Sequence, residues 1–230
     1  MSNEEIITRP AYFVTYCGFK IDPAWRRLPH SARADGRTTF AQVVAEFDGI
    51  KTYAYSTIGF KTSCELLLWR KGNDPKLMQE MTARLLQTGI GQYMELTYNL
   101  FGFTRPSTYT KRPTTQEQAI DVDDRQSYLI VYPFAKTTEW FLMSRDARQG
   151  MMNEHMRIGH DYADIPQVLL YSTGLDDQEF IVAYECEELT RFSALVTDLR
   201  ATEARRYTLR DTPILTGAHY ELGKALELIG

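Results

Sequence analysis

The sequence has few cysteines and no long apolar segment. Its 230 residues include three cysteines, Cys17, Cys64 and Cys186, which are widely spaced and form neither a CxxC pair nor a zinc pattern. We interpret them as reduced, buried thiols in strands. No apolar run approaches the roughly 18 residues of a membrane-spanning helix, so no membrane partner is expected.

An excess of basic residues and a secretory signal are also missing. The formal net charge is −4, with 26 Lys and Arg against 30 Asp and Glu, so nothing favours nucleic acid as a partner. The first ten residues, MSNEEIITRP, carry acidic side chains where a signal peptide is positive, and no apolar segment follows. The expected location is therefore the cytoplasm.

Several common catalytic motifs are absent as well. The sequence contains no GxGxxG, P-loop, GxSxG or HExxH pattern, so nucleotide-binding, serine-hydrolase and zinc-peptidase functions have no direct support. Hydrophobic residues make up 43% and charged residues 24%, which is ordinary for a globular protein. The chain is long enough to bury a core as one domain or as two small ones.

The most informative feature that is present is an internal duplication. The Tyr-Ser-Thr triplet at 55–57 recurs 116 positions later at 171–173. The same displacement relates three residues near the start of each half: Tyr12, Tyr16 and Lys20 correspond to Tyr128, Tyr132 and Lys136. Several matches in one register indicate that the two halves of the chain have the same fold.

Each half predicts the element order β-α-β-β-α-β, which is that of a ferredoxin-like unit. In the first half the strands are expected near 11–20, 52–58, 63–71 and 93–103, and the helices near 31–47 and 74–88. In the second half the strands are expected near 127–136, 167–173, 178–185 and, weakly, 205–216, and the helices near 144–162 and 188–201.

The predicted fold class is therefore α+β, a duplicated ferredoxin-like fold. Its two sheets would bury their open faces against each other, as in a dimeric α/β barrel. We assign residues 1–105 to the N-terminal half, 106–124 to a linker rich in polar residues and proline, and 125–230 to the C-terminal half.

Among the four histidines, His155 is the one that the sequence places for burial. On the predicted helix it shares an apolar face with Met151, Ile158 and Tyr162. Gly159 lies one turn further along, where a missing side chain leaves room for a flat group. A lone histidine among apolar neighbours is more often a satisfied core residue than a ligand, so the residues alone leave both interpretations open.

A second set of candidates lies on the strand that begins at Tyr128. Alternate residues share a face, which places Tyr132 and Lys136 on the same side, about 13 Å apart at roughly 3.3 Å per residue. A buried tyrosine with a cation further along suits an acidic ligand that tolerates aromatic neighbours. A tyrosine at the edge of the core beside a solvated lysine is the alternative.

Four segments of the C-terminal half resemble chlorite dismutase-like proteins, a haem protein family that includes bacterial coproheme decarboxylases. They are Tyr132-Pro133-Phe134-Ala135-Lys136, Glu139-Trp140-Phe141, Asn153-Glu154-His155 and Ser172-Thr173-Gly174-Leu175-Asp176-Asp177. The N-terminal half is similar more loosely, including 100–106 with Tyr109. The resemblance implies the duplicated ferredoxin-like fold, an iron porphyrin cofactor (coproheme or haem b) and a homo-oligomer, often a pentamer.

The resemblance also implies roles for particular residues. His155 falls on the iron ligand of the family, and either Glu154 or a more distant carboxylate would hydrogen-bond its other ring nitrogen. Gln167 occupies the position of the distal arginine of chlorite dismutases, where decarboxylases of one bacterial group carry Gln. Tyr132 and Lys136 match the tyrosine and lysine of that group's Tyr-Pro-Met-Ser-Lys motif. Weaker candidates for porphyrin binding are Arg105, Tyr109, Arg125 and Trp140.

The implied activity is decarboxylation of coproheme to haem b with hydrogen peroxide as co-substrate. Peroxide would oxidise the iron centre, and Tyr132 would pass the oxidising equivalent to a propionate as a tyrosyl radical. Loss of CO2 would leave a vinyl group, and the reaction would occur at two propionates, with Lys136 anchoring one. Phe134-Ala135 departs from the motif, and the segment from His155 to Gln167 is one residue shorter. Chlorite dismutation and haem binding without turnover are the alternative functions.

Overall fold

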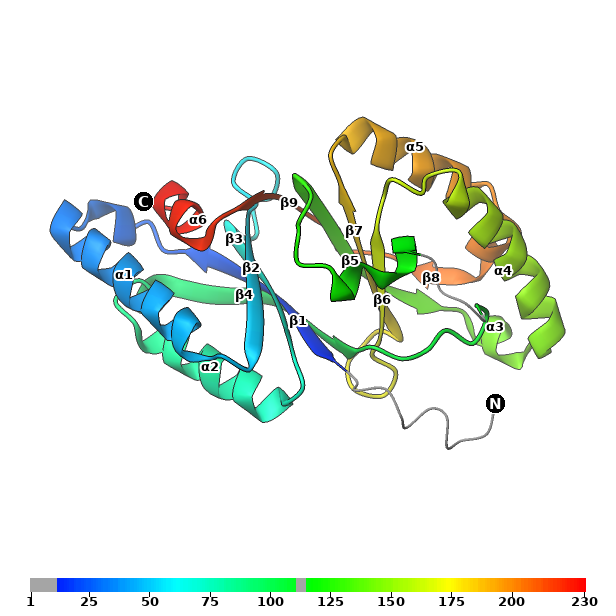
Figure 1. Ribbon diagram of the computed structural model, residues 1–230, viewed down its shortest axis with the longest axis horizontal. Helices are drawn as coiled ribbons and strands as arrows, with labels where there is room; N and C mark the ends of the chain where they lie inside the picture. Colours follow the sequence, from blue (N-terminus) through cyan, green and yellow to red (C-terminus); the bar gives the residue numbers. More distant parts are fainter. Residues whose placement is uncertain (1–11, 111–114) are drawn as a thin grey trace. The chain divides into compact units, whose positions relative to one another are not determined.

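The computed structural model describes residues 12–110 and 115–230, and the chain divides into two compact units (Figure 1). The first unit comprises Met1–Thr104 with Thr216–Gly230, and the second comprises Arg105–Leu215. Within the described ranges, every helix is too short or too polar to cross a bilayer.

The first unit is an antiparallel sheet covered by helices. Its strands lie in the order β4-β1-β3-β2-β9, with bounds Phe13–Ile21 (β1), Ile50–Ser56 (β2), Leu66–Gly72 (β3), Met94–Phe103 (β4) and Leu215–Tyr220 (β9). The helices are His30–Glu46 (α1), Pro75–Gln87 (α2) and Leu222–Leu228 (α6), with short 3-10 turns at Trp25–Arg27 (η1) and Gly91–Tyr93 (η2). One core joins the sheet to all three helices through Phe19, Leu68, Phe40, Met81 and Leu226.

The second unit repeats this plan with a smaller sheet. Its strands lie in the order β6-β7-β5-β8, with bounds Tyr128–Lys136 (β5), Gln167–Tyr171 (β6), Phe180–Cys186 (β7) and Thr208–Arg210 (β8). The helices are Thr138–Leu142 (α3), Arg145–His160 (α4) and Leu189–Arg200 (α5), with 3-10 turns at Thr115–Asp121 (η3) and Glu203–Tyr207 (η4). In Figure 1, α4 and α5 lie on the same side of this sheet.

Strand register decides which side chains of the second unit face these helices. Tyr132 pairs with Val182, and Val182 in turn pairs with Leu169, so these three side chains form one row across the sheet. The next row on the same face contains Ile130, Tyr184 and Gln167. Because Val182, Tyr184 and Ile130 pack with Leu195 of α5 and with Tyr162 beyond α4, this face is the one that the helices cover.

The predicted fold of two ferredoxin-like halves is confirmed, since each unit contains the β-α-β-β-α-β order. The structure groups the last residues, Thr216–Gly230, with the first unit. β9 pairs with β2 (Ala54 opposite Tyr220), and α6 contributes Leu226 and Ile229 to the core of the first unit. The weak strand expected near 205–216 is η4 followed by the three-residue β8, and the predicted linker contains η3.

The interpretation of the cysteines is confirmed in its main point, because all three are free and buried. Cys17 lies in β1 and Cys186 ends β7, whereas Cys64 precedes β3 by two residues.

Candidate functional site

Helix α4 carries His155 and is not packed tightly onto the sheet. It begins after Ser144, whose Oγ accepts a hydrogen bond from the Ala147 N–H, and it packs beside α5 and η4. Whereas α1, α2 and α5 each bury residues in a core, none of the side chains of α4 is fully buried. Met151, His155 and Ile158 are all half-buried, so the face that the sequence predicts to be apolar is left partly open.

The environment of His155 keeps its imidazole neutral. Burial lowers the pKa of His155 to about 4. The positive charge of Lys136 lowers this pKa further, and the negative charge of Glu154 raises it. In the part of the chain that the structure describes, no group hydrogen-bonds to the ring. The Glu154 carboxylate instead accepts a hydrogen bond from the Glu203 N–H at 3.2 Å, at the start of η4. A neutral imidazole with available ring nitrogens is the form of histidine that binds a metal.

Lys136 lies at the end of β5, close to α3 and η4. Its Nζ is 4.4 Å from the centre of the Trp140 ring and donates a hydrogen bond to the Ala204 carbonyl at 3.3 Å. Burial, together with the charge of Arg205, lowers the pKa of Lys136 to about 8. The side chain is therefore a cation at neutral pH that is close enough to His155 to affect its pKa.

Trp140 forms the aromatic centre of this part of the site. It is 3% exposed and lies between the rings of Tyr109 and Tyr207, with centroid distances of 6.4 and 6.0 Å. Tyr109 is held there by its carbonyl, which accepts a hydrogen bond from Gln149 Nε2 of α4. The structure thus brings together Lys136, Trp140, Tyr109 and the helix of His155.

Tyr132 is half-buried in the middle of the sheet face that the helices cover. Its phenol is hydrogen-bonded to that of Tyr184, and the two ring centroids are 6.2 Å apart. Burial raises the pKa of Tyr132 well above its usual value and that of Tyr184 to about 12. Both side chains are therefore uncharged phenols at neutral pH.

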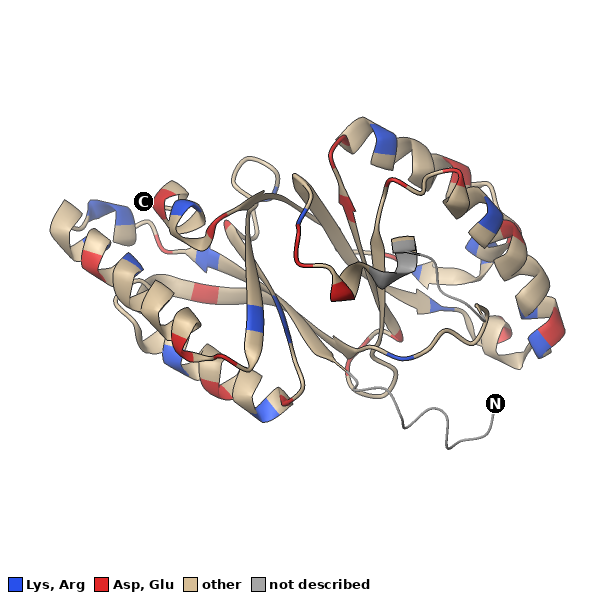
Figure 2. Ribbon diagram, viewed as in Figure 1, with Lys and Arg blue, Asp and Glu red and all other residues tan. Residues whose placement is uncertain are grey.

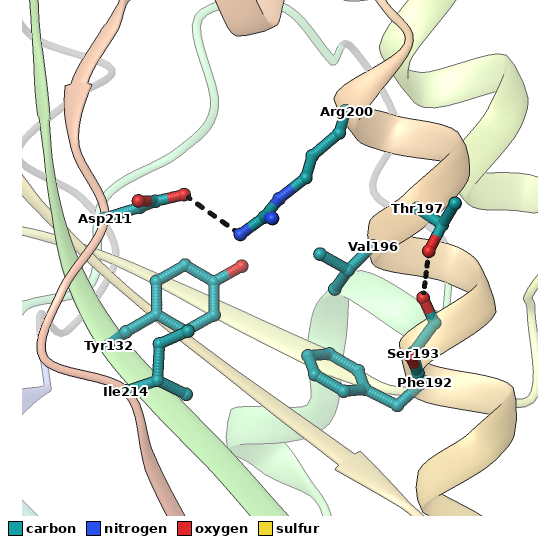
Figure 3. Close-up of a pocket in the computed structure, with 8 residues that line it drawn as sticks. All are labelled: Tyr132, Phe192, Ser193, Val196, Thr197, Arg200, Asp211 and Ile214. Carbon is teal, nitrogen blue, oxygen red and sulfur yellow. Dashed lines mark hydrogen bonds and ion pairs between the residues drawn. The ribbon is translucent and has the colours of Figure 1, made fainter.

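A pocket of about 290 Å³ opens beside Tyr132 (Figure 3). Figure 3 shows the Tyr132 hydroxyl pointing toward Arg200, the last residue of α5. The remaining lining residues come from α5 and from the segment after β8: Phe192, Ser193, Val196, Thr197, Asp211 and Ile214. The sequence interpretation missed Arg200, Asp211 and Tyr184, although Tyr184 stands in an alternating pattern with Phe180 and Val182 that predicts a shared face.

Gln167 and Arg105 lie near the other edge of the same sheet face. Gln167 begins β6 opposite Tyr184, and Leu169 beside it is 39% exposed. The Arg105 guanidinium lies 5.0 Å from the centre of the Tyr171 ring, at the end of β6. Leu169 is thus an apolar side chain open to solvent, with the Gln167 amide on one side and the Arg105 cation on the other. This arrangement suits a ligand with a flat apolar body and acidic edges.

Arg125 does not belong to this group. It forms an ion pair with Glu185 at 3.1 Å, and the two side chains are only 2% and 4% exposed. Glu185 pairs in register with Leu129, so it lies on the opposite face of the sheet from Tyr132. The structure therefore places the charge of Arg125 in a buried ion pair, on the face of the sheet opposite Tyr132.

Charged residues of the second unit are spread over its helices and loops (Figure 2). Within the described ranges, no group of three or more His, Cys, Asp and Glu residues could hold a metal ion. His155 is thus a single candidate ligand, as for an iron that is otherwise held by a porphyrin.

Comparisons with known proteins identify the family of this chain. Residues 30–220 match the protein family described as chlorite dismutase. The chain is 29% identical to the coproheme decarboxylase of Mycolicibacterium smegmatis over 164 residues, which is 71% of this chain and 70% of that protein. It is 22% identical to the chlorite dismutase of Ideonella dechloratans over 214 residues, 90% of this chain and 75% of that protein.

Among solved structures, the chlorite dismutase from Candidatus Nitrospira defluvii in complex with imidazole has a TM-score of 0.88 to this chain. The two are 26% identical, and the match covers 98% of each chain.

Proposed function

The chain belongs to the chlorite dismutase family, and we propose that it is a peroxide-dependent coproheme decarboxylase that converts iron coproporphyrin to haem b. The observation that carries this proposal is Tyr132, an uncharged phenol beside a pocket, on the sheet face that α5 and the segment after α4 cover. The 29% identity to a coproheme decarboxylase supports the same activity.

We place the iron porphyrin in the partly open region beside α4. His155 would ligate the iron, Leu169 and Trp140 would pack against the apolar macrocycle, and Lys136 and Arg105 would pair with carboxylates at its edge. When bound, the iron porphyrin supplies the redox centre at which peroxide is reduced.

The overall reaction balances with one peroxide for each propionate. A propionate, one hydrogen peroxide and one proton give a vinyl group, CO2 and two molecules of water, so the propionate loses two electrons and peroxide gains them. Tyr132 gives up the hydrogen atom of its phenol and recovers one from the propionate carbon next to the ring. Its raised pKa supports this role, because only the neutral phenol has a hydrogen atom to give.

Lys136 and Gln167 would orient the reactants by different means. Lys136 is cationic below about pH 8 and offers a charge-assisted hydrogen bond to a propionate. Gln167 offers only an amide dipole, which favours neutral peroxide over an oxychlorine anion. The amide in place of a cation is therefore the feature that argues against chlorite dismutation.

A comparison of substrates tests this choice. The protein loaded with haem b is given chlorite in an oxygen electrode, and the protein loaded with iron coproporphyrin is given peroxide and its porphyrin is weighed by mass spectrometry. We expect loss of carboxyl groups in the second assay and slow or no oxygen evolution in the first. Rapid oxygen evolution without any loss of carboxyl groups would identify a chlorite dismutase.

We extend the proposal to assembly and location. A homo-oligomer, namely a ring of five subunits, is what the family resemblance favours, and we also propose a cytoplasmic location. Light scattering of the purified protein measures the first and fractionation of the source cells the second.

A further inference from the structure

The pocket beside Tyr132 is too small for a porphyrin but suits one of its side chains. Its volume is about 290 Å³, below the range of roughly 300–1,000 Å³ that is usual for drug-sized ligands. Phe192, Val196 and Ile214 give it apolar walls, and Arg200 with Asp211 gives it a charged end (Figure 3). A ligand with a short hydrocarbon chain that ends in a charged group would match both the apolar walls and the charged end.

The charged end of the pocket favours an anion. Asp211 Oδ2 is 2.8 Å from Arg205 Nη1 but 4.0 Å from Arg200 Nη2, so the carboxylate is satisfied mainly by Arg205. Two guanidinium groups share one carboxylate, which leaves a net positive charge. In the described part of the chain, the side chain of Arg200 makes no hydrogen bond, so its N–H donors are available.

Arg200 and the Tyr132 hydroxyl face the same space. Figure 3 shows the hydroxyl directed toward the guanidinium, and the charge of Arg200 acts on the phenol, opposing the effect of burial on its pKa. A carboxylate paired with Arg200 would therefore bring its own hydrocarbon arm alongside the Tyr132 oxygen.

We propose that this pocket binds a reactive propionate of iron coproporphyrin and that Arg200 pairs with its carboxylate. The inference rests on the proposed function and adds a substrate-binding residue to it. The reaction removes the carboxylate and leaves a vinyl group, which cannot accept a hydrogen bond from a guanidinium. Arg200 thus distinguishes the substrate from haem b, the product.

Binding measurements without peroxide test this assignment. Iron coproporphyrin and haem b are each titrated into the parent protein, Arg200→Gln and Arg206→Gln, and the dissociation constants are read from absorbance. Arg206 is a matched control, since its side chain is 75% exposed on η4 and its partner there is Glu203. We expect Arg200→Gln to weaken iron coproporphyrin about tenfold and haem b less than about threefold, and Arg200→Lys to restore part of the difference.

Two results would overturn the assignment. If Arg200→Gln leaves the affinity for iron coproporphyrin unchanged, Arg200 does not bind a carboxylate of the substrate. If it weakens both porphyrins equally, the pocket does not distinguish the reactive propionate. Circular dichroism confirms that each variant is folded. If the parent protein binds iron coproporphyrin but never decarboxylates it, the proposed function is wrong. A selective loss of affinity in Arg200→Gln would then still support the role of Arg200 in binding.

Discussion

Tyr132 and Tyr184 form a hydrogen-bonded pair of phenols on the neighbouring strands β5 and β7, with ring centroids 6.2 Å apart. Burial raises the pKa of both, so neither ionises at neutral pH. Only Tyr132 also lines the pocket that contains Arg200. The pair therefore has one member exposed to a ligand and one that supports it from within the core.

Replacement of Tyr132 separates reaction from binding. We expect Tyr132→Phe to slow decarboxylation by about 100-fold or more, because it removes the transferable hydrogen, while iron coproporphyrin still binds. Tyr184→Phe removes only the supporting hydrogen bond and should slow the reaction much less. Mass analysis of the porphyrin over time measures both rates, and a Tyr132→Phe rate equal to that of the parent would refute the radical role.

Replacement of His155 tests the iron ligand. His155→Ala should weaken binding of iron coproporphyrin by at least about tenfold and shift its main absorbance band, because the metal loses its protein ligand. The iron-free porphyrin should bind equally well before and after the change. His160→Ala is the control, since His160 is exposed at the end of the same helix. Unchanged spectra in His155→Ala would remove His155 from the site.

The affinity for iron coproporphyrin should depend on pH through Lys136. Its pKa is lowered to about 8, so the side chain is charged below that pH and neutral above it. Because the porphyrin carboxylates stay ionised throughout, the affinity should fall as the pH rises through about 8. Lys136→Met should bind more weakly and show no such step. A step of the same size in Lys136→Met would assign the titration to another group.

Arg125 should matter for stability and not for binding. Removing one member of its buried pair with Glu185 leaves an uncompensated charge, so Arg125→Met should lower the free energy of unfolding by about 3–5 kcal/mol. Arg191→Met breaks an exposed pair with Asp164 and should cost less than about 1 kcal/mol. Urea titrations compare the two. Weaker porphyrin binding by folded Arg125→Met would show that Arg125 also contributes to the binding site.

The fold could be predicted from the sequence because strands, helices and the duplication each leave a periodic pattern in it. Alternating apolar residues and the repeat of 116 positions predict both sets of strands and helices, and the structure contains them. The place of the last strand could not be predicted in this way. β9 pairs with β2, more than 150 positions earlier in the chain, and no local pattern records such a long-range choice of partner.

The candidate site was predicted in part for the same reason. The alternation in β5 places Tyr132 and Phe134 on one face. The register shifts between Ala135 and Lys136, but the Lys136 Nζ lies 5.9 Å from the centre of the Phe134 ring. Arg125 precedes that strand, where alternation no longer indicates a face, and its buried partner Glu185 lies on another strand. Arg200 and Tyr132 line the same pocket only because α5 packs over β5. That packing depends on tertiary structure and leaves no local pattern in the sequence.

A stoichiometric titration tests the central claim most directly. The protein is loaded with one equivalent of iron coproporphyrin, hydrogen peroxide is added in small portions, and the porphyrin is analysed by mass spectrometry after each addition. The account predicts loss of one carboxyl group and then a second, complete after about two equivalents of peroxide, with haem b as the product. Bleaching of the porphyrin, or full consumption of peroxide with all four carboxylates retained, would contradict it.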